Sequence, residues 1–228
     1  MSVDFTISDS TVQGVLFVFE AIGVVAFALS GVVAAVRARL DLVGVVVIAL
    51  LTALGGGTIR DLLLDRSPFF WVIHQEYLWV IIGLSVLGAM VLRSRHFDLT
   101  ERAIQWPDAL GLGVFAASGA QIALQNGSSP LIATMMGVIT ASVGGILRDV
   151  LLNKVPWLVA SYQHYAIIAF VGGWLVWGLN ELGASPAVSV AISALVAATW
   201  RLLAIAFNWQ LPNWRRDDHT GAIALPPQ

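Results

Sequence analysis

The sequence predicts an all-α integral membrane protein with seven transmembrane helices. Of the 228 residues, 58% are hydrophobic and only 11% are charged, whereas about a quarter of the residues in a typical soluble domain are charged. The mean hydropathy of +0.83 also indicates a membrane protein. An internal repeat with a constant spacing of 88 residues then predicts how the helices are arranged.

Seven apolar stretches approach the length of about 20 residues that a helix needs to cross a hydrocarbon core of about 30 Å. Each is predicted to form one transmembrane helix, although the third and the sixth need flanking residues to reach across. The stretches are Val12–Val36, Leu42–Leu64, Tyr77–Leu92, Pro107–Leu124, Pro130–Leu152, Tyr165–Leu179 and Pro186–Phe207.

A Gly-Gly-x-x-Arg-Asp motif occurs twice inside these stretches. Residues 55–61 read GGGTIRD and residues 143–149 read VGGILRD, so that aligned positions are 88 apart. The same spacing aligns residues 20–31 (EAIGVVAFALSG) with residues 108–119 (DALGLGVFAASG) without a gap. Further identical pairs at this spacing are Thr52 and Thr140, Pro68 and Pro156, Gln75 and Gln163, and Tyr77 and Tyr165. One spacing over so many positions indicates two related units.

The repeat divides the chain into two three-helix units and a seventh helix. Because three spans is an odd number, consecutive units must enter the membrane with opposite topology, which gives an inverted repeat of a kind common in transporters. The predicted divisions are a short outer N-terminus at 1–11, repeat units at 12–100 and 101–183, the seventh helix at 184–212 and a flexible cytoplasmic tail at 213–228.

Basic residues in the loops predict that the N-terminus lies outside and the C-terminus in the cytoplasm. Only Arg60 and Arg66 fall on the outer side. The start of the chain lacks the basic region of a cleavable signal peptide, so the first apolar stretch is expected to be retained as a helix. The basic residues on the inner side are Arg37, Arg39, Arg93, Arg95, Arg102, Lys154, Arg215 and Arg216.

The repeated glycines interrupt two apolar stretches at matching depths. Gly55, Gly56 and Gly57 lie in the second stretch, and Gly144 and Gly145 lie in the fifth. Three adjacent glycines cost roughly 2–3 kcal/mol of helix propensity relative to alanine, which favours a kink or a short unwound stretch that would offer carbonyl groups to a cation. The alternative is close helix packing, since glycine lets two backbones approach each other.

A charged pair follows each set of glycines, and the two pairs are predicted to stand at opposite ends of a pathway. Inversion places the first pair near the outer end of the second span and the other near the inner end of the fifth. Because adjacent residues on a helix do not face each other, each arginine is expected to pair with an acid on another helix. The candidate mouth or gate residues are Arg60, Asp61, Arg148, Asp149 and the repeat-related acids Glu20 and Asp108.

Two other interpretations of these charges are open. Charged side chains near span ends can snorkel to lipid headgroups and act as interfacial anchors. Asp108 follows Pro107 and would then serve as a helix N-cap. Glu20 lies about two turns inside its span and is the more informative acid.

Repeated hydroxyl residues are predicted to line the same path or to bond to carbonyl groups of their own helices. The chain has no cysteine, which excludes disulfides and thiolate ligands, and its four histidines have no ligand spacing. No P-loop, zinc motif, nucleophile elbow or dinucleotide fingerprint occurs, so neither an enzyme nor a cofactor is expected. The repeated hydroxyl residues are Ser30, Ser118, Thr52 and Thr140.

With GGGTIRDLLL at 55–64 and GGILRDVLL at 144–152, the chain resembles the bacterial TRIC (trimeric intracellular cation) channel family, which is also grouped under the name glycine transporter. The resemblance spans about Glu20 to Phe207. It implies an inverted three-plus-three repeat plus one helix, with the second and fifth helices kinked at the glycines and lining a pore. It also implies a homotrimer in the cell (inner) membrane, with lipids and no nucleic acid as partners and with K⁺ or Na⁺ as the permeant ion.

The sequence departs from animal members of that family in its fourth span. No lysine or arginine occurs between Gln105 and Leu147, so the basic voltage-sensing residues attributed to that helix are missing. Voltage gating and regulation by lipid headgroups are therefore not expected here.

We expect a passive K⁺-permeable channel with one pore in each protomer. The alternative is a secondary transporter of a small zwitterion such as glycine, since broken helix ends suit a carboxylate and an ammonium group and inverted repeats suit alternating access. A structural protein without flux would not explain the motif in both halves. Small-residue faces that are candidates for the trimer contact are Gly31 with Ala34 and Ala35, and Gly172 and Gly173 with Ala187–Ala198.

Overall fold

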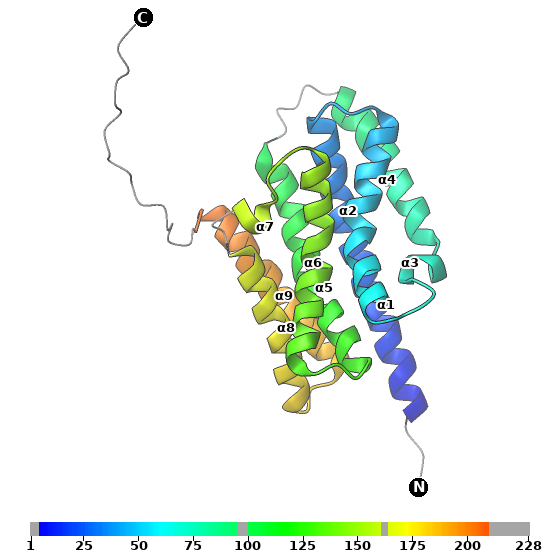
Figure 1. The fold of residues 1–228 in the computed structure, drawn as a ribbon, viewed down its shortest axis with the longest axis vertical. Coiled ribbons are helices and arrows are strands. Elements are labelled where there is room, and N and C mark those ends of the chain that lie inside the picture. Colours follow the sequence, from blue (N-terminus) through cyan, green and yellow to red (C-terminus); the bar gives the residue numbers. More distant parts are fainter. Residues whose placement is uncertain (1–4, 95–99, 161–163, 210–228) are drawn as a thin grey trace, which may run out of the picture.

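The computed structural model describes residues 5–94, 100–160 and 164–209, and in these ranges the secondary structure is entirely α-helical (Figure 1). Seven of the helices described are long, and two are single turns. The helices are α1 (Phe5–Arg37), α2 (Leu42–Leu63), α3 (Phe70–Ile73), α4 (Glu76–Ser94), α5 (Glu101–Gln125), α6 (Pro130–Leu151), α7 (Trp157–Ala160), α8 (Tyr165–Glu181) and α9 (Pro186–Ala206).

Each of the seven apolar stretches corresponds to one long helix. Within the described ranges, four helices are long and apolar enough to cross a membrane, namely α1 from Gln13 onward, α2, α6 and α9. Helix α4 is apolar but shorter, and α5 carries Glu101, Asp108 and Gln121 among many small residues. The structure therefore supports an all-helical membrane protein, whereas the count of seven spans stays a prediction.

Helix α5 is the centre of the bundle. Every residue from Gly111 to Ala123 is buried, and α1, α6, α8 and α9 all pack against it. The helix begins at Glu101, so Pro107 lies inside it. The predicted start at Pro107 was thus too late, and the interpretation of Asp108 as an N-cap is wrong because that residue already lies two turns into the helix.

Repeat-related residues of α1 and α5 contact each other. The rings of Phe27 and Phe115, which are 88 residues apart, have their centroids 5.3 Å apart. A Cβ atom added to Gly23 would lie 2.6 Å from the Phe115 ring, and one added to Gly111 would lie 2.9 Å from the Phe27 ring. Gly23 precedes Phe27 on α1, whereas its partner Phe115 follows Gly111 on α5. The two helices therefore run in antiparallel directions where they cross, and a local two-fold axis relates them.

The small-residue faces considered for trimer contacts are used for packing inside the protomer. A Cβ atom on Gly31 would lie 2.9 Å from the Cα of Ala49 in α2, and one on Gly173 would lie 3.0 Å from the Cα of Thr134 in α6. Gly172 packs beside Ala197 of α9. Small side chains let these helices approach closely, so Gly31, Gly172 and Gly173 offer no free face for a second copy. In the stretch Ala187–Ala198, by contrast, Leu195 and Val196 are exposed.

One ion pair links the end of α1 to the start of α5, two helix ends that the distribution of basic residues predicts on the same side of the membrane. Arg37 at the end of α1 lies with its Nη2 atom 3.7 Å from Oε1 of Glu101 at the start of α5. This contact puts the two ends on one side of the bundle. Arg95, Arg215 and Arg216, on which the predicted orientation also rests, lie outside the described residues, as does the tail beyond residue 209.

Candidate functional site

Helices α2 and α6 cross with their backbones in direct contact at the repeated glycines. A Cβ atom on Gly56 would collide with the carbonyl oxygen of Thr140, and one on Gly144 would collide with the carbonyl oxygen of Thr52. The two contacts are equivalent under the 88-residue repeat. Only glycine fits at either position because any side chain would have to displace a main-chain atom of the partner helix.

The helices continue through the glycines without a break. Helix α2 is helical from Leu42 to Leu63 and α6 from Pro130 to Leu151. The structure therefore does not contain the unwound stretch that the sequence analysis considered, and no carbonyl group in α2 or α6 is freed by unwinding at the glycines. Packing against the partner helix offsets the low helix propensity of glycine, since tertiary contacts commonly override propensity. A kink stays a prediction.

The two repeated threonines bond within their own helices at this crossing. Thr52 donates its Oγ1 hydrogen to the carbonyl of Ile48 at 2.6 Å, and Thr140 donates to the carbonyl of Met136 at the same distance. Both side chains are fully buried. Four of the predicted path residues, namely Thr52, Gly56, Thr140 and Gly144, thus come together in a tight contact between α2 and α6, whereas Gly57 and Gly145 do not lie at this contact.

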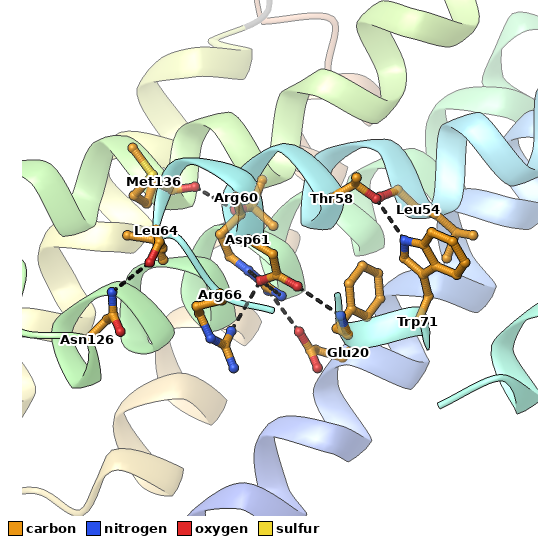
Figure 2. Close-up of polar contacts among 12 residues, drawn as sticks. Glu20, Leu54, Thr58, Arg60, Asp61, Leu64, Arg66, Trp71, Asn126 and Met136 are labelled. Carbon is orange, nitrogen blue, oxygen red and sulfur yellow. Dashed lines mark hydrogen bonds and ion pairs between the residues drawn. The ribbon is translucent and has the colours of Figure 1, made fainter. Parts of the chain in front are cut away.

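Arg60 is the centre of one buried cluster of charges near the end of α2 (Figure 2). Its Nη1 lies 2.8 Å from Oε1 of Glu20 in α1, and its Nε donates to Oδ1 of Asp61 at 2.9 Å. The Arg60 side chain is 0% exposed. Arg66, which is partly exposed, adds a contact of 3.2 Å to the same Asp61 oxygen.

Arg148 is the centre of the equivalent cluster in the second half. Its Nη1 donates to Oδ1 of Asp108 at 2.6 Å and to Oγ of Ser30 at 2.6 Å, and its Nε donates to Oδ1 of Asp149 at 2.8 Å. Ser30 in turn donates to the carbonyl of Ile104 at 3.1 Å. The Ser30 bridge therefore ties α1 to both α5 and α6.

These contacts correct two expectations and support a third. Arg60 and Arg148 do pair with Glu20 and Asp108 on other helices, as the repeat predicted. Each arginine also pairs with the aspartate beside it, which we had not expected. A guanidinium on a long flexible stem can turn back to the next residue although the two Cβ atoms diverge. Snorkelling to lipid headgroups is wrong for both arginines because they are buried inside the bundle.

The short helices α3 and α7, which the sequence analysis missed, cover these clusters. The amide of Phe70 donates to Oδ2 of Asp61 at 2.9 Å, and the amide of Trp157 donates to Oδ2 of Asp149 at 3.2 Å. The guanidinium carbons of the two arginines lie 5.4 Å and 4.5 Å from the same aromatic rings. A single turn has no periodicity to detect, but the repeated prolines at 68 and 156 mark the place where each begins.

The two clusters differ in how their surroundings are filled. A Cβ atom on Gly57 would collide with the ring of Phe70, whereas one on the equivalent Gly145 would lie 3.5 Å from both Asp108 Oδ1 and Tyr165 Oη. Beside Gly145 a cavity offers about 10 Å³ to the centre of a water molecule, which is about enough for one water. The lining residues are Ser142, Gly145, Ile146, Arg148, Asp149, Trp157, Leu158 and Tyr165.

A third buried arginine lies at the second cluster and had been given no site role. Arg201 of α9 is 1% exposed, and its guanidinium carbon lies 5.0 Å from the centroid of the Tyr165 ring. An ionisable residue buried in an apolar span is a functional candidate by default. The presence of an arginine inside an apolar stretch would have been enough to include Arg201 among the candidate site residues from the sequence.

Two further predictions concern Ser118 as a residue of the path and the histidines as possible metal ligands. Ser118 is fully buried, and its Oγ has no hydrogen-bond partner. Among the described residues, no group of three His, Asp or Glu side chains could hold a metal ion. His74 lies with Nδ1 3.0 Å from Glu76, and His96 and His219 fall outside the described ranges.

Comparison with known proteins identifies the family. A family model described as Glycine transporter matches twice, over residues 17–93 and 105–181. The chain is 38% identical to a UPF0126 membrane protein of Vibrio cholerae, over 87% of this chain and 82% of the relative. It is 35% identical to the UPF0126 inner membrane protein YadS of Escherichia coli, over 88% of this chain and 96% of the relative.

The fold is similar to that of solved cation channels. The TRIC trimeric intracellular cation channel orthologue from Rhodobacter sphaeroides superimposes with a TM-score of 0.79 at 33% identity, covering 86% of this chain and 99% of that structure. These relatives and neighbours are membrane proteins and channels, in agreement with a chain that is not an enzyme. The chain belongs to the family described as Glycine transporter, and its solved structural neighbours are the TRIC channels that the repeated motif had indicated.

Proposed function

We propose that the protein is a homotrimeric, K⁺-permeable channel for monovalent cations, with a separate pathway in each protomer. The observation that carries the proposal is the pair of buried charge clusters, placed by the repeat at opposite ends of the α2–α6 crossing. Charged groups inside a membrane segment are costly and commonly mark an ion pathway. The TRIC cation channels among the structural neighbours support the same function.

The charge of the Arg60 cluster favours cations over anions. This cluster holds one buried guanidinium against the two carboxylates of Glu20 and Asp61. In the second cluster the carboxylates of Asp108 and Asp149 are balanced by Arg148 and by the buried Arg201 beside it. Arg66, at the rim of the first cluster, is 41% exposed and so is screened by solvent. An excess of buried carboxylate over buried guanidinium attracts cations to the Arg60 end of the pathway.

In this proposal the chain has seven spanning helices, arranged as inverted units at 12–100 and 101–183 with the seventh helix at 184–212. The antiparallel contacts between Phe27 and Phe115, and between the glycines of α2 and α6, support this arrangement. The protein lies in the cell membrane with its N-terminus outside and its C-terminus in the cytoplasm. The inner-membrane location of YadS supports this placement.

The glycines are assigned to the pathway and the charges to its gates. The pathway residues proposed are Gly55, Gly56, Gly57, Gly144, Gly145, Ser30, Ser118, Thr52 and Thr140, and the gate residues are Arg60, Asp61, Arg148, Asp149, Glu20 and Asp108. Because the backbones of α2 and α6 touch at Gly56 and Gly144, conduction requires these helices to separate or to kink there. The structure is therefore interpreted as a closed form.

Purified protein in planar lipid bilayers tests the proposal. We expect discrete single-channel currents that carry K⁺ in preference to Cl⁻, from a protein that runs as a trimer after chemical cross-linking. The family description also names glycine, so uptake of labelled glycine into proteoliposomes should be measured on the same preparation. Saturable glycine uptake that unlabelled glycine competes away, with no ionic current, would establish a carrier instead.

A further inference from the structure

The two ends of the proposed pathway are not equivalent, although the repeat makes their charge clusters alike. We propose that Phe70 is the residue that closes the Arg60 end, by filling the space over Gly57, and that the Arg148 end has no such plug. This inference rests on the proposed channel function and identifies the group that blocks one of its ends.

Phe70 is held in place from several sides. Its side chain is 4% exposed, and its amide donates to Oδ2 of Asp61 at 2.9 Å. Its ring lies 5.4 Å from the guanidinium carbon of Arg60 and 5.8 Å from the ring of Tyr77. The plug thus contacts the gate charges of α2 and the first turn of α4 at the same time.

Helix α3, which begins at Phe70, has a second attachment to α2. Trp71 donates its Nε1 hydrogen to Oγ1 of Thr58 at 3.1 Å, and Figure 2 shows this bond beside the Arg60 cluster. Thr58 itself donates to the carbonyl of Leu54 at 2.8 Å. Two neighbouring aromatic residues therefore fix α3 on one face of α2, directly after the three glycines.

The absence of a side chain at position 57 is what lets the ring sit so deep. A Cβ atom on Gly57 would collide with the Phe70 ring, so the ring is packed against the main chain of α2. A ring seated on backbone next to a guanidinium leaves no room for water between them. Water and ions cannot reach Arg60 from this side without displacing Phe70.

At the other end Trp157 also bonds to an aspartate and covers the arginine, but no ring fills the space over the glycine. The residue 88 positions after Phe70 is Leu158, and no part of it is among the three atoms nearest to a Cβ on Gly145. Those atoms belong to Asp108, Tyr165 and Arg148, all at 3.5–3.7 Å. Trp157 covers Arg148 instead, and the remaining space has room for about one water molecule.

The difference predicts how the Arg60 end opens. In this proposal Phe70 leaves its position when α3 moves away from α2, which breaks the hydrogen bond from the Phe70 amide to Asp61. That carboxylate then keeps its pairing with Arg60 and gains an oxygen open to a cation. Removal of the plug and exposure of a cation ligand therefore occur in one movement.

Matched substitutions at repeat-related positions test the plug. Phe70→Ala removes the ring, and Leu158→Ala makes the same kind of truncation at the other end. In single-channel recordings we expect Phe70→Ala to raise the open probability about tenfold or more and Leu158→Ala to change it less than about twofold, because only the first removes a block that biases the closed state. Equal effects, or a lower open probability for Phe70→Ala, would overturn the assignment.

A second measurement tests the position of Phe70 without any current. Gly57→Ala forces the ring out, whereas Gly145→Ala meets only ordinary contacts. By hydrogen exchange on the trimer in lipid nanodiscs, we expect Gly57→Ala to speed exchange of the amides at residues 70–73 at least about tenfold, and Gly145→Ala to leave residues 157–160 within about twofold. Unchanged exchange in Gly57→Ala would contradict the plug. If exchange follows the prediction but no variant conducts, the channel function fails, and the blocking role of Phe70 fails with it.

Discussion

Gly56 and Gly144 each pack against the main-chain carbonyl of the residue four positions before the other, namely Thr140 and Thr52. This reciprocal contact joins the two halves of the molecule through their backbones. It explains why glycine stands at both positions without appeal to flexibility. It also makes this crossing the place where the two halves must part if a pathway opens between them.

Replacing either of these glycines with alanine should destabilise the protein. The added methyl group meets a carbonyl oxygen of the facing helix, and overpacking of this kind typically costs about 1–3 kcal/mol. Chemical denaturation of the purified protein in detergent, followed by tryptophan fluorescence, measures the change.

The control is Gly83→Ala in α4, where a Cβ atom has nothing within 4 Å. There alanine should be neutral or slightly stabilising because it has the higher helix propensity. The double variant Gly56→Ala/Gly144→Ala should cost less than the sum of the single changes, since one methyl group already separates the helices. Full additivity would argue against one shared contact.

Ser30→Ala should lower the free energy of unfolding more than Ser118→Ala, although the two serines are repeat-related and both fully buried. Ser30 donates to the carbonyl of Ile104 and accepts from Arg148, so alanine there removes two buried hydrogen bonds, at a cost of about 1–3 kcal/mol. The Oγ of Ser118 has no hydrogen-bond partner, so alanine there should be close to neutral. Equal losses in the free energy of unfolding would show that the Ser30 bridge adds nothing.

Arg148→Met should destabilise the protein strongly, because it leaves Asp108 and Asp149 buried without their hydrogen bonds to Arg148. Breaking a buried ion pair from one side typically costs about 3–5 kcal/mol. The triple variant with Asp108→Asn and Asp149→Asn removes the uncompensated charge and should recover a large part of the loss. The yield of folded protein and the denaturation midpoint measure both effects, and failure of the triple variant to recover stability would indicate a steric role for Arg148.

Arg66→Ala should change stability by less than about 1 kcal/mol, because its pair with Asp61 is partly exposed. Its effect should appear in conduction at low salt, where loss of a positive charge at the rim increases cation entry. Raising the ionic strength should remove the difference between variant and unaltered protein. A large stability loss that is independent of salt would mean that Arg66 belongs to the buried cluster.

Much of the architecture could be predicted from the sequence because membrane helices have strong signals. The seven long helices, the 88-residue repeat and the pairing of Arg60 with Glu20 all follow from apolar length and from the repeated motif. The same alignment paired Phe27 with Phe115 as equivalent positions, but their contact was not predicted. Features that follow from the length of an apolar stretch or from the spacing of a repeat can therefore be predicted from the sequence.

Other features depend on side-chain reach and on local packing, which the sequence does not display. The contact of Arg60 with Asp61 needs a stem that turns back on its own helix. The uninterrupted helix at Gly55–Gly57 needs a partner backbone that occupies the space left by the glycines. Helices α3 and α7 are single turns, too short for a periodic pattern. Their position over the charges had to come from the structure.

The reversal potential of single channels in a KCl gradient tests the proposed function most directly. The purified protein is placed in a planar bilayer with unequal KCl on the two sides, and the voltage of zero current is recorded. The account predicts a reversal potential close to the equilibrium potential of K⁺. A value close to the equilibrium potential of Cl⁻, or no channel currents from intact trimers, would contradict it.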